Sequence, residues 1–486
     1  MTNTPRPHQT VIIGAGMSGI CMAISLKRAG LHNFVILEKS DQAGGTWHEN
    51  RYPGAQCDVQ SHLYAFSFAP NPDWTRRYAG SAEIQAYLQN LIRQFDLTGH
   101  LQLNTAVKTA RFDEADGLWT LVTGDGRILM SQAIALSQAP LHEPRWPQIP
   151  GLDSFGGKLI HTAKWPETHS LRGRKVAVIG NAASAVQLVP PVARQAAELT
   201  VFQRSANWIM PRGDRLFTGL ERQLLRRPIP ARAYRWFLAA RYESNRLGFT
   251  PHSAASRFAA KQAQSHLTRQ VSDPALRQTL TPDYPLGCKR ILVTDDYYPA
   301  LQRPNVRLET RPISAASQTG LILTTGESLE FDDIICATGF DIGGSLARID
   351  ITGRAGASLA RQQADKPAAL HGMTVPDFPN LFLLLGPNTA TGHTSTLLYI
   401  EAQTGYVVQC LQELNRRARK ALVVREAVYQ AHNKALQDRL RETVWGADCT
   451  SWYKSTDGHN GTIYPGFTPQ YRRAVKRPDF SQFEFL

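Results

Sequence analysis

Cysteine is scarce in this chain, and no two cysteines stand close together. Only six cysteines are scattered through 486 residues, and none forms a C-x-x-C pair. This spacing excludes a sequence-adjacent redox dithiol and does not indicate a cysteine-rich zinc site or any other metal centre. We expect reduced, largely buried thiols. The six positions are Cys21, Cys57, Cys288, Cys336, Cys410 and Cys449.

Long apolar runs are also missing. The stretch 381–385 is typical of the longest, whereas about 20 apolar residues are needed to span a bilayer. Residues 1–9 lack the basic region and apolar stretch of a signal peptide. Hydrophobic residues make up 42% of the chain and charged residues 19%, which is typical of a globular protein. The length predicts two or more domains. We therefore expect a cytoplasmic enzyme or binding protein.

Acidic residues are too few to balance the basic ones, and the formal net charge is +14. The excess is densest between Arg212 and Arg290. Nucleic-acid binders usually carry a recognisable module or aromatics interleaved with the charge, and this sequence has neither. The charge instead indicates either a positive field around a polyanionic cofactor or a solvated basic face.

A glycine-rich turn near the N-terminus has the context of a dinucleotide-binding unit. A β-branched strand runs into Gly14, Gly16 and Gly19 in the pattern G-x-G-x-x-G, a helical stretch follows, and a second strand, 34–37, ends at Glu38. The first glycine permits the tight turn, the second lets the backbone approach a pyrophosphate, and the third allows close helix–strand packing. The helix N-terminus then faces the phosphates.

The same architecture returns at residue 175. Glu38 follows Gly14 by 24 positions, and Arg204 follows Gly180 by the same 24. A carboxylate at the strand end accepts hydrogen bonds from ribose hydroxyls and repels an added phosphate, whereas an arginine favours a 2′-phosphate. The first unit is therefore predicted to bind an adenine dinucleotide without that phosphate and the second to bind NADP. Two such units in one chain indicate FAD plus NADPH.

Two places depart from the pattern of a flavoprotein with two such units. Ala182 replaces the middle glycine of the second turn, which predicts slightly weaker or displaced NADP binding. Residues 332–341 contain an A-T-G turn and resemble the segment that returns the chain to the FAD domain. The other crossing is expected near 133–150, where residues 137–139 read Ser-Gln-Ala instead. The proline-rich stretch 140–150 still predicts an interdomain connection.

Two longer patterns identify the class. Residues 44–58 match [A/G]-G-x-W-x4-[F/Y]-P-G-x3-D, and residues 155–166 match F-x-G-x3-H-x3-W-P. At every specified position they resemble the signatures of Baeyer–Villiger monooxygenases. The resemblance implies an enzyme that uses NADPH, FAD and O2 to insert oxygen next to a ketone carbonyl through a C4a-peroxyflavin, giving an ester or lactone. In the related monooxygenases that oxidise nitrogen and sulfur, the second signature usually lacks the Trp-Pro ending.

The resemblance covers nearly the whole chain and implies an α/β fold. We expect two Rossmann-like dinucleotide-binding domains, one for FAD and one for NADP, with a helical insertion in the NADP domain. The FAD-binding domain is expected over 1–148 and 345–486, the NADP-binding domain over 149–211 and 284–344, and the insertion over 212–283.

The resemblance also supplies the catalytic candidates. The stretch 284–290 resembles the family segment that carries the active-site arginine, and the matching position is Arg290. By the family pattern, Asp58 lies near the flavin and orients this arginine. A guanidinium keeps its charge at any working pH and presents several donors in a rigid fork, which suits an anionic peroxide and its anionic adduct with a carbonyl. The alternative is that Arg290 is only a structural ion-pair partner.

The expected cofactor-binding residues lie in the two glycine turns, at the strand ends that follow them, in the first signature, beside Arg290 and in the turn after strand 381–385. They are Gly14, Gly16, Gly19, Glu38, Gly45, Thr46, Trp47, Asp58, Gly180, Ser184, Arg204, Ser205, Lys289 and Asn388. The resemblance implies that Lys289 holds the 2′-phosphate of NADP together with Arg204 and Ser205.

Several residues have two interpretations. The family motif places His161 on the interdomain linker, which favours a role in domain movement over proton transfer, and Trp165 is expected to pack. His393 either lines the substrate pocket or is a hydrogen-bonded structural histidine. The stretch 231–244, with aromatics among arginines, either lies on a membrane surface or packs on its own domain, and the second reading is favoured.

Two other functions stay open. The same peroxyflavin in its protonated form oxygenates amine nitrogen or thioether sulfur, so the small-molecule partner is a ketone, an aldehyde or a thioether. A flavin-binding protein that regulates without turnover has the altered positions at Ala182 and 137–139 as its only support. A disulfide reductase is disfavoured because no dithiol is present.

Overall fold

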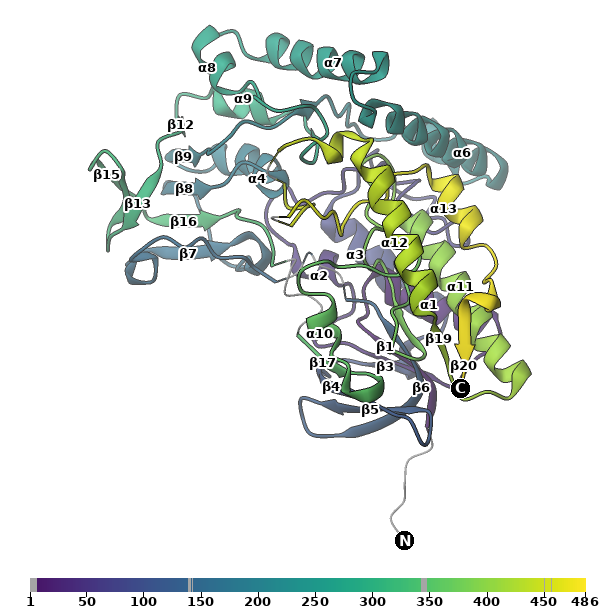
Figure 1. Cartoon of the computed structure of the whole chain (residues 1–486). Helices are drawn as coiled ribbons and strands as arrows, with labels where there is room; N and C mark the ends of the chain where they lie inside the picture. The colour runs from purple at the N-terminus through teal and green to yellow at the C-terminus, as the bar shows by residue number, and fades with distance from the viewer. Residues whose placement is uncertain (1–6, 139–140, 142, 342–347, 450, 456) are drawn as a thin grey trace.

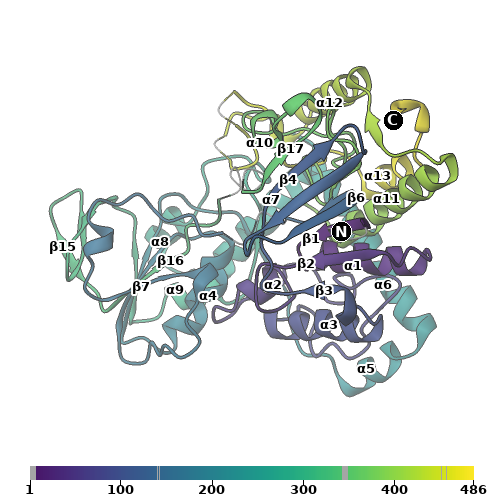
Figure 2. The ribbon, with the colours of Figure 1, turned by 90° about the horizontal axis from the view of Figure 1, so that it is seen from below.

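The computed structural model describes residues 7–138, 141, 143–341, 348–449, 451–455 and 457–486. The chain forms two lobes, each built around a twisted sheet with helices packed against it (Figure 1). In Figure 1 the larger sheet lies at the lower centre, and the smaller one lies at the upper left. Figure 2 shows the two sheets from below, at opposite sides of the molecule.

The larger sheet has eight strands in the order β17-β4-β5-β6-β1-β2-β3, and β18 pairs with β6. Pairing is parallel except for the antiparallel β4–β5 and β5–β6 pairs. Its strands are β1 (His8–Ile13), β2 (Phe34–Leu37), β3 (Leu101–Gln102), β4 (Val107–Asp113), β5 (Leu118–Thr123), β6 (Ile128–Leu136), β17 (Asp350–Thr352) and β18 (Leu381–Leu383).

The smaller sheet is wholly parallel, with five strands in the order β12-β9-β8-β16-β7. They are β7 (Lys158–His161), β8 (Lys175–Ile179), β9 (Glu198–Phe202), β12 (Val306–Glu309) and β16 (Asp333–Cys336). Short pairings complete the strands: β10 (Ile209–Met210) with β11 (Leu292–Val293), β13 (Ile313–Ala316) with β14 (Gly320–Leu323) and β15 (Ser328–Glu330), and β19 (Leu422–Val424) with β20 (Phe483–Phe485).

The α-helices are α1 (Met17–Arg28), α2 (Thr46–Glu49), α3 (Ser81–Gln94), α4 (Ala183–Ala193), α5 (Gly219–Leu225), α6 (Pro228–Ser244), α7 (Ala254–Gln270), α8 (Pro274–Thr279), α9 (Tyr297–Leu301), α10 (Leu359–Gln362), α11 (Leu397–Arg417), α12 (Glu426–Arg441) and α13 (Thr468–Ala474). Helix α1 connects β1 to β2 and helix α4 connects β8 to β9, as parallel pairing requires. No helix among the described residues is long and apolar enough to cross a bilayer.

The strands of both dinucleotide units are buried on both faces, which is why their sequences read as apolar runs rather than as alternations. The last four residues of β1, all of β2 and all of β16 are buried. Helix α1 fills the space between the larger sheet and helices α3 and α11. This arrangement confirms the predicted α/β fold with two Rossmann-like units, and α5 to α8 lie within the predicted helical insertion.

Two segments connect the lobes and pair with each other. Arg145 N donates to the carbonyl oxygen of Gly339 at 3.0 Å, Thr338 Oγ1 donates to that of Arg145 at 2.6 Å, and Pro144 bridges to Phe340. The first crossing was predicted near 133–150, and Ala139 and Pro140 of that stretch lie outside the described residues. The predicted domain boundary at 344/345 also lies outside them.

The cysteine prediction is partly wrong. Cys21, Cys57, Cys336 and Cys410 are free and buried as expected, and burial raises the pKa of Cys21 and of Cys336 to about 12, so these thiols are unreactive. Cys288 and Cys449 instead form a disulfide across 161 residues of sequence. Cysteine spacing reports only local pairs, so a bridge closed by the tertiary fold leaves no signal in it.

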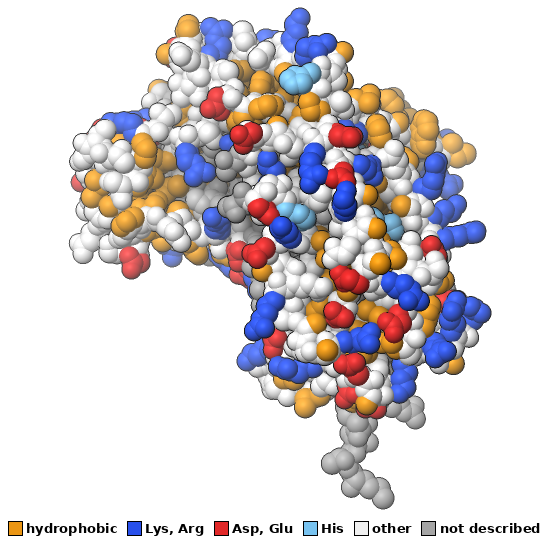
Figure 3. Space-filling view, viewed as in Figure 1, with side chains coloured by type: hydrophobic (Ala, Val, Ile, Leu, Met, Phe, Trp, Pro, Cys, Tyr) orange, Lys and Arg blue, Asp and Glu red, His pale blue; other side chains and the backbone are white. Residues whose placement is uncertain are grey.

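The basic side chains that give the chain its net charge are visible on the surface. In Figure 3, lysine and arginine side chains are spread over this face with acidic side chains between them. Groups of at least three His, Cys, Asp or Glu side chains able to hold a metal ion are absent from the described part of the chain.

Candidate cofactor and active site

The first glycine turn brings three backbone segments together. Gly14 has a φ of 102°, and a Cβ there would lie 2.7 Å from the carbonyl oxygen of Ser137. A Cβ on Gly19 would lie 1.9 Å from the carbonyl oxygen of Gly14. Gly16 faces Gly45, where a Cβ would lie 2.9 Å from the Gly16 Cα. The entrance above α1 is therefore walled by bare backbone, so a flat or phosphorylated ligand can approach closely.

Glu38 stands at the end of β2 and is almost fully buried. Its carboxylate accepts hydrogen bonds from Ala15 N at 2.7 Å and from Ser40 N at 3.0 Å. These bonds fix the carboxylate beside the glycine turn, and each oxygen keeps a further lone pair for a hydroxyl donor. The position fits the ribose-binding role predicted for Glu38, and that role stays a prediction.

The second turn repeats the arrangement with one difference. Gly180 has a φ of 111°, and a Cβ there would lie 2.6 Å from the carbonyl oxygen of Ala337. Ala182 precedes α4 with a φ of −84°, which an alanine adopts without strain. Neither α1 nor α4 has a side-chain cap or an acidic residue in its first turn. Their free N–H groups and positive dipole ends suit phosphate groups.

Lys289 reaches Ser205, which lies beyond the end of β9. Lys289 Nζ lies 3.4 Å from Ser205 Oγ and 4.3 Å from the centre of the Tyr284 ring. Arg204, the residue before Ser205, is exposed. Asn181 Nδ2 donates to the Ser205 carbonyl oxygen at 2.7 Å and so ties this loop to the second glycine turn. The cations of Arg204 and Lys289 and the hydroxyl of Ser205 come from two segments and are a suitable set for a phosphate monoester.

The first signature packs directly against the second dinucleotide unit. Tyr52 OH donates to Gln187 Oε1 on α4 at 2.8 Å. Gln187 Nε2 donates in turn to the carbonyl oxygen of Gln56 at 2.9 Å. Gly54 has a φ of 85°, and a Cβ there would lie 2.2 Å from the Gln187 carbonyl oxygen. Tyr52 therefore bonds the first signature to α4. Gly54 lies so close to α4 that no side chain fits at this position.

Asp58 ends the first signature and forms an ion pair with Arg290, whose Nη2 donates to Asp58 Oδ2. Burial by itself raises the pKa of Asp58, but the charge of Arg290, its hydrogen bond and the charge of Arg212 together hold that pKa below its usual value. The charge of Asp58 in turn raises the pKa of Arg290. The side chains keep 33% and 39% of their surfaces exposed, so the pair retains free hydrogen-bonding positions.

Residues that the motifs do not single out hold this pair. Arg212 Nη2 donates to the carbonyl oxygen of Cys57 at 2.6 Å, and its guanidinium also contacts Gln56 Oε1. Tyr453 is buried close enough to Arg290 and Asp58 to feel both charges, although burial is the main cause that raises its pKa to about 12. Arg212 lies at the start of the basic stretch found in the sequence, which is the only signal that pointed to it.

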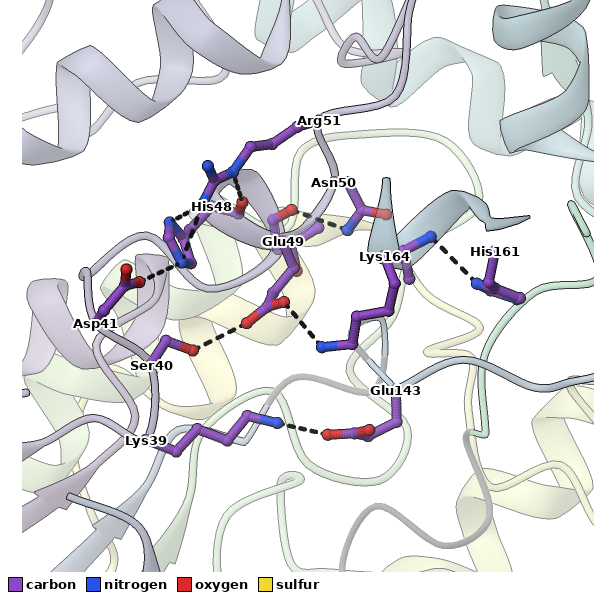
Figure 4. Close-up of polar contacts among 12 residues, drawn as sticks. Lys39, Ser40, Asp41, His48, Glu49, Asn50, Arg51, Glu143, His161 and Lys164 are labelled. Carbon is purple, nitrogen blue, oxygen red and sulfur yellow. Dashed lines mark hydrogen bonds and ion pairs between the residues drawn. The ribbon is translucent and has the colours of Figure 1, made fainter. Parts of the chain in front are cut away.

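An ion pair joins the two signatures, as Figure 4 shows. Glu49 of the first signature accepts a hydrogen bond from Ser40 Oγ at 2.9 Å and lies 3.3 Å from Lys164 Nζ of the second. Burial favours a higher pKa for Glu49, but Ser40 and Lys164 together lower it. Arg51 of the first signature also pairs with Glu167, the residue that follows the second signature. The family signatures thus meet at one place beside the interlobe crossing.

His161 is buried at the end of β7, between both connecting segments. Its ring lies 5.2 Å from the ring of Trp146 and 6.4 Å from that of Phe340, centre to centre. Burial lowers its pKa to about 4, so the ring is neutral at pH 7, and its Nδ1 accepts a hydrogen bond from Ala163 N at 3.1 Å. This setting favours the linker role over proton transfer. Trp165 packs against the apolar core of the smaller lobe, as predicted.

Two further candidates, Trp47 and Asn388, are held by local contacts. Trp47, which follows Thr46 at the start of α2, donates from Nε1 to Tyr64 OH at 3.1 Å. Asn388 donates from Nδ2 to the carbonyl oxygens of Asn460 and Ile463 at 2.6 and 3.0 Å, so it anchors the turn after β18.

His393 is buried, with Nδ1 2.9 Å from Thr391 Oγ1 and Nε2 3.5 Å from Glu243 Oε2. These contacts favour the structural reading of this histidine over a place in the substrate pocket. Ser184 lies in the first turn of α4, beside Tyr52. The site thus spans both signatures and both glycine turns.

Comparisons with known proteins agree with this geometry. Residues 11–216 match a family model described as pyridine nucleotide-disulphide oxidoreductase, although the chain has no C-x-x-C pair. A Streptomyces coelicolor protein named Baeyer-Villiger monooxygenase is 39% identical over 98% of this chain and 92% of its own length.

Two solved structures are similar over almost the full chain. One is titled oxidized steroid monooxygenase bound to NADP, with 28% identity, a TM-score of 0.87 and 99% of each chain covered. The other is titled OTEMO complex with FAD and NADP, with 25% identity, a TM-score of 0.89, and 99% of this chain and 100% of that chain covered.

Proposed function

Since the chain belongs to the Baeyer–Villiger monooxygenases, we propose that it uses NADPH, FAD and O2 to insert one oxygen atom next to the carbonyl carbon of a ketone. The product is an ester or a lactone. The observation that carries the proposal is the Asp58–Arg290 pair, which joins the first signature to the segment 284–290 and keeps free donors on the arginine. An aldehyde is a chemically equivalent substrate.

The two glycine turns are the expected cofactor sites. The first, with Gly14, Gly16, Glu38 and the facing Gly45, has the side-chain-free walls and the fixed carboxylate that FAD requires. The second, with Gly180, has the same uncapped helix N-terminus for the pyrophosphate of NADPH. FAD held at the first turn would carry electrons from NADPH to O2, which supplies the inserted oxygen atom.

Arg290 provides the positive charge that oxygen insertion into a carbonyl needs. Negative charge develops on oxygen when a carbonyl is attacked, and a guanidinium already held by a carboxylate needs no reorganisation to stabilise it. Asp58 acts through Arg290: its charge and hydrogen bond fix the direction of the fork. The disulfide at Cys288 constrains the backbone two residues before Arg290, which further limits its movement.

A product panel tests the reaction class. The purified enzyme is incubated with NADPH and with cyclic, aromatic and linear ketones beside matched thioethers, and the products are separated by gas chromatography. We expect ester or lactone from at least one ketone, with sulfoxide formed in addition. Sulfoxide alone across the panel would favour the nitrogen- and sulfur-oxidising relatives. NADPH that fails to bleach the flavin absorbance would favour a regulator without turnover.

Arg204 is the proposed determinant of NADPH over NADH. Replacing Arg204 with glutamine removes one charge-assisted contact to the 2′-phosphate, so we expect the KM for NADPH to rise roughly 10- to 100-fold, the range of about 1.5–3 kcal/mol for such contacts. The KM for NADH is expected to change little. Steady-state kinetics with both cofactors measure this, and Arg194→Gln, an exposed arginine on the far end of α4, is the matched control.

The domain boundaries, the roles of the remaining cofactor-binding residues and a cytoplasmic location stay predictions. Ala182 does not support the alternative of a regulator without turnover, because its backbone conformation is an ordinary one for alanine.

A further inference from the structure

Helices α5 and α6 carry a concentration of exposed large apolar side chains. Six of them fall within 22 residues of sequence, and Ile229 and Trp236 are 81% and 76% exposed. We call this surface the α5–α6 face. Its apolar members are Leu216, Leu220, Leu224, Ile229, Trp236 and Phe237. Figure 3 shows hydrophobic side chains gathered over α6, at the upper right, with lysine and arginine side chains beside them.

The opposite side of α6 is firmly attached to the protein, so the exposure is not that of a loose helix. Leu238 is buried, and Tyr234 OH donates to Gln60 Oε1 at 3.1 Å. Arg235 Nη1 donates to three carbonyl oxygens of the segment 62–65, at 2.6 to 3.2 Å. Aromatic and apolar residues therefore point both into the protein and away from it. Sequence periodicity alone does not reveal such a two-sided helix.

Exposed arginines alternate with the apolar side chains along the sequence. Among the residues that the structure describes, four exposed arginines of this face form no ion pair: Arg222, Arg227, Arg232 and Arg241. The acidic residues nearby are already engaged, since Glu221 pairs with Arg215 and Asp73 with Arg226. The α5–α6 face thus combines an apolar centre with a net positive rim.

We propose that the α5–α6 face docks the enzyme on the surface of a bilayer that contains anionic lipid. Trp and Phe with Leu and Ile enter the headgroup boundary, and the arginines bind the lipid phosphates. Each arginine held near an anionic surface strengthens binding roughly fivefold. A second copy of the chain fits less well, because a two-fold contact through this face would bring its unpaired arginines together.

Docking through this face also has a consequence for substrate supply, and only this consequence rests on the proposed function. The segment 60–65 that holds α6 follows Asp58 directly. The membrane would then lie one helix away from the active-site pair, and apolar ketones concentrate in lipid.

The test uses the FAD-loaded enzyme and two kinds of vesicle, phosphatidylcholine alone and phosphatidylcholine with about a third phosphatidylglycerol, in a flotation assay. We expect at least tenfold stronger binding to the anionic vesicles, falling steeply as salt rises. Trp236→Ser with Ile229→Ser is expected to reduce binding at least tenfold. Ile128→Ser, on a similarly exposed side chain of β6 that is 60% exposed, is expected to leave binding unchanged.

A charge-matched pair of variants separates location from net charge. Glutamine at Arg222, Arg227, Arg232 and Arg241 is expected to remove the preference for anionic vesicles. Glutamine at four exposed arginines elsewhere, Arg172, Arg194, Arg269 and Arg303, lowers the net charge equally and is expected to keep it.

The proposal is overturned if the wild-type enzyme does not bind the anionic vesicles at low salt. It is also overturned if both arginine variants lose the preference for anionic vesicles equally. Self-association that Trp236→Ser abolishes, measured by light scattering without vesicle binding, assigns the face to a dimer and also overturns it. Each variant is accepted only with a full complement of FAD. Ketone turnover without vesicles is measured separately, so a failure of the proposed reaction is distinguishable from a failure of docking.

Discussion

Replacing Arg290 with alanine is expected to abolish ester formation while NADPH oxidation continues. The guanidinium is the charged group that the family resemblance predicts, and the geometry places, beside Asp58, and it does not belong to either glycine turn. Removing one fixed donor from a site where negative charge develops typically costs about 10²–10³ in rate. We expect at least that loss in ester yield, with the reducing equivalents recovered as hydrogen peroxide.

The measurement pairs gas chromatography of the ester with NADPH absorbance and a peroxide assay. Arg290→Lys keeps the charge but loses the fork that Asp58 holds, so it should recover only a small part of the rate. Asp58→Asn keeps the size and removes the charge that orients Arg290. It should lower the rate of ester formation strongly and change the KM for the ketone little. An alanine variant that still makes ester at the parental rate would remove Arg290 from the mechanism.

The Asp58–Arg290 pair predicts that the protein loses stability in acid. The pKa of Asp58 is depressed in the folded protein, whereas a free aspartate has a pKa of about 3.9. A group of this kind contributes stability above its unfolded pKa and loses the contribution as pH falls through its folded pKa. The pair should therefore stabilise the protein fully at neutral pH and lose this contribution only in acid, below the pKa of a free aspartate. Thermal midpoints measured against pH, for the parent and for Asp58→Asn, check this.

Some of the structure could be predicted from local sequence, because local patterns determine local geometry. The strand 34–37 coincides with β2, and the two glycine turns follow buried parallel strands as their spacing requires. The pairing of Asp58 with Arg290 came from the family resemblance alone, since 232 positions separate them in the chain and no periodicity connects them.

What the sequence missed depends on contacts between distant segments. The Cys288–Cys449 bridge, the support of Asp58 by Arg212 and the contact of Gly54 with Gln187 arise only when the two lobes are assembled. The exposed side of α6 was missed for another reason. Apolar residues on both sides of a helix look like a buried helix in sequence, and only the fold determines which side is covered.

Replacing Gly19 with alanine is expected to yield protein without FAD. The added methyl group would lie 1.9 Å from the carbonyl oxygen of Gly14 and 3.3 Å from Ile12 Cγ2. The first obstacle is backbone, so α1 has to move away from β1. The movement displaces both the glycine turn and the helix N-terminus that face the pyrophosphate. Overpacking of this kind costs about 1–3 kcal/mol of folding stability even where side chains can give way.

Gly405→Ala in α11 is the matched control, because α11 packs against α1 but a Cβ at Gly405 meets nothing within 4 Å. Alanine is about 1 kcal/mol better than glycine inside a helix, so this variant should bind FAD fully and melt slightly higher. The ratio of flavin to protein absorbance after purification, and the thermal midpoint with added FAD, distinguish the two. The second unit carries Ala185 at the position that corresponds to Gly19, fully buried. The second unit thus accommodates a methyl group at this point, whereas a Cβ at Gly19 meets backbone. A Gly19→Ala protein that keeps its flavin would show that α1 can shift without losing the cofactor.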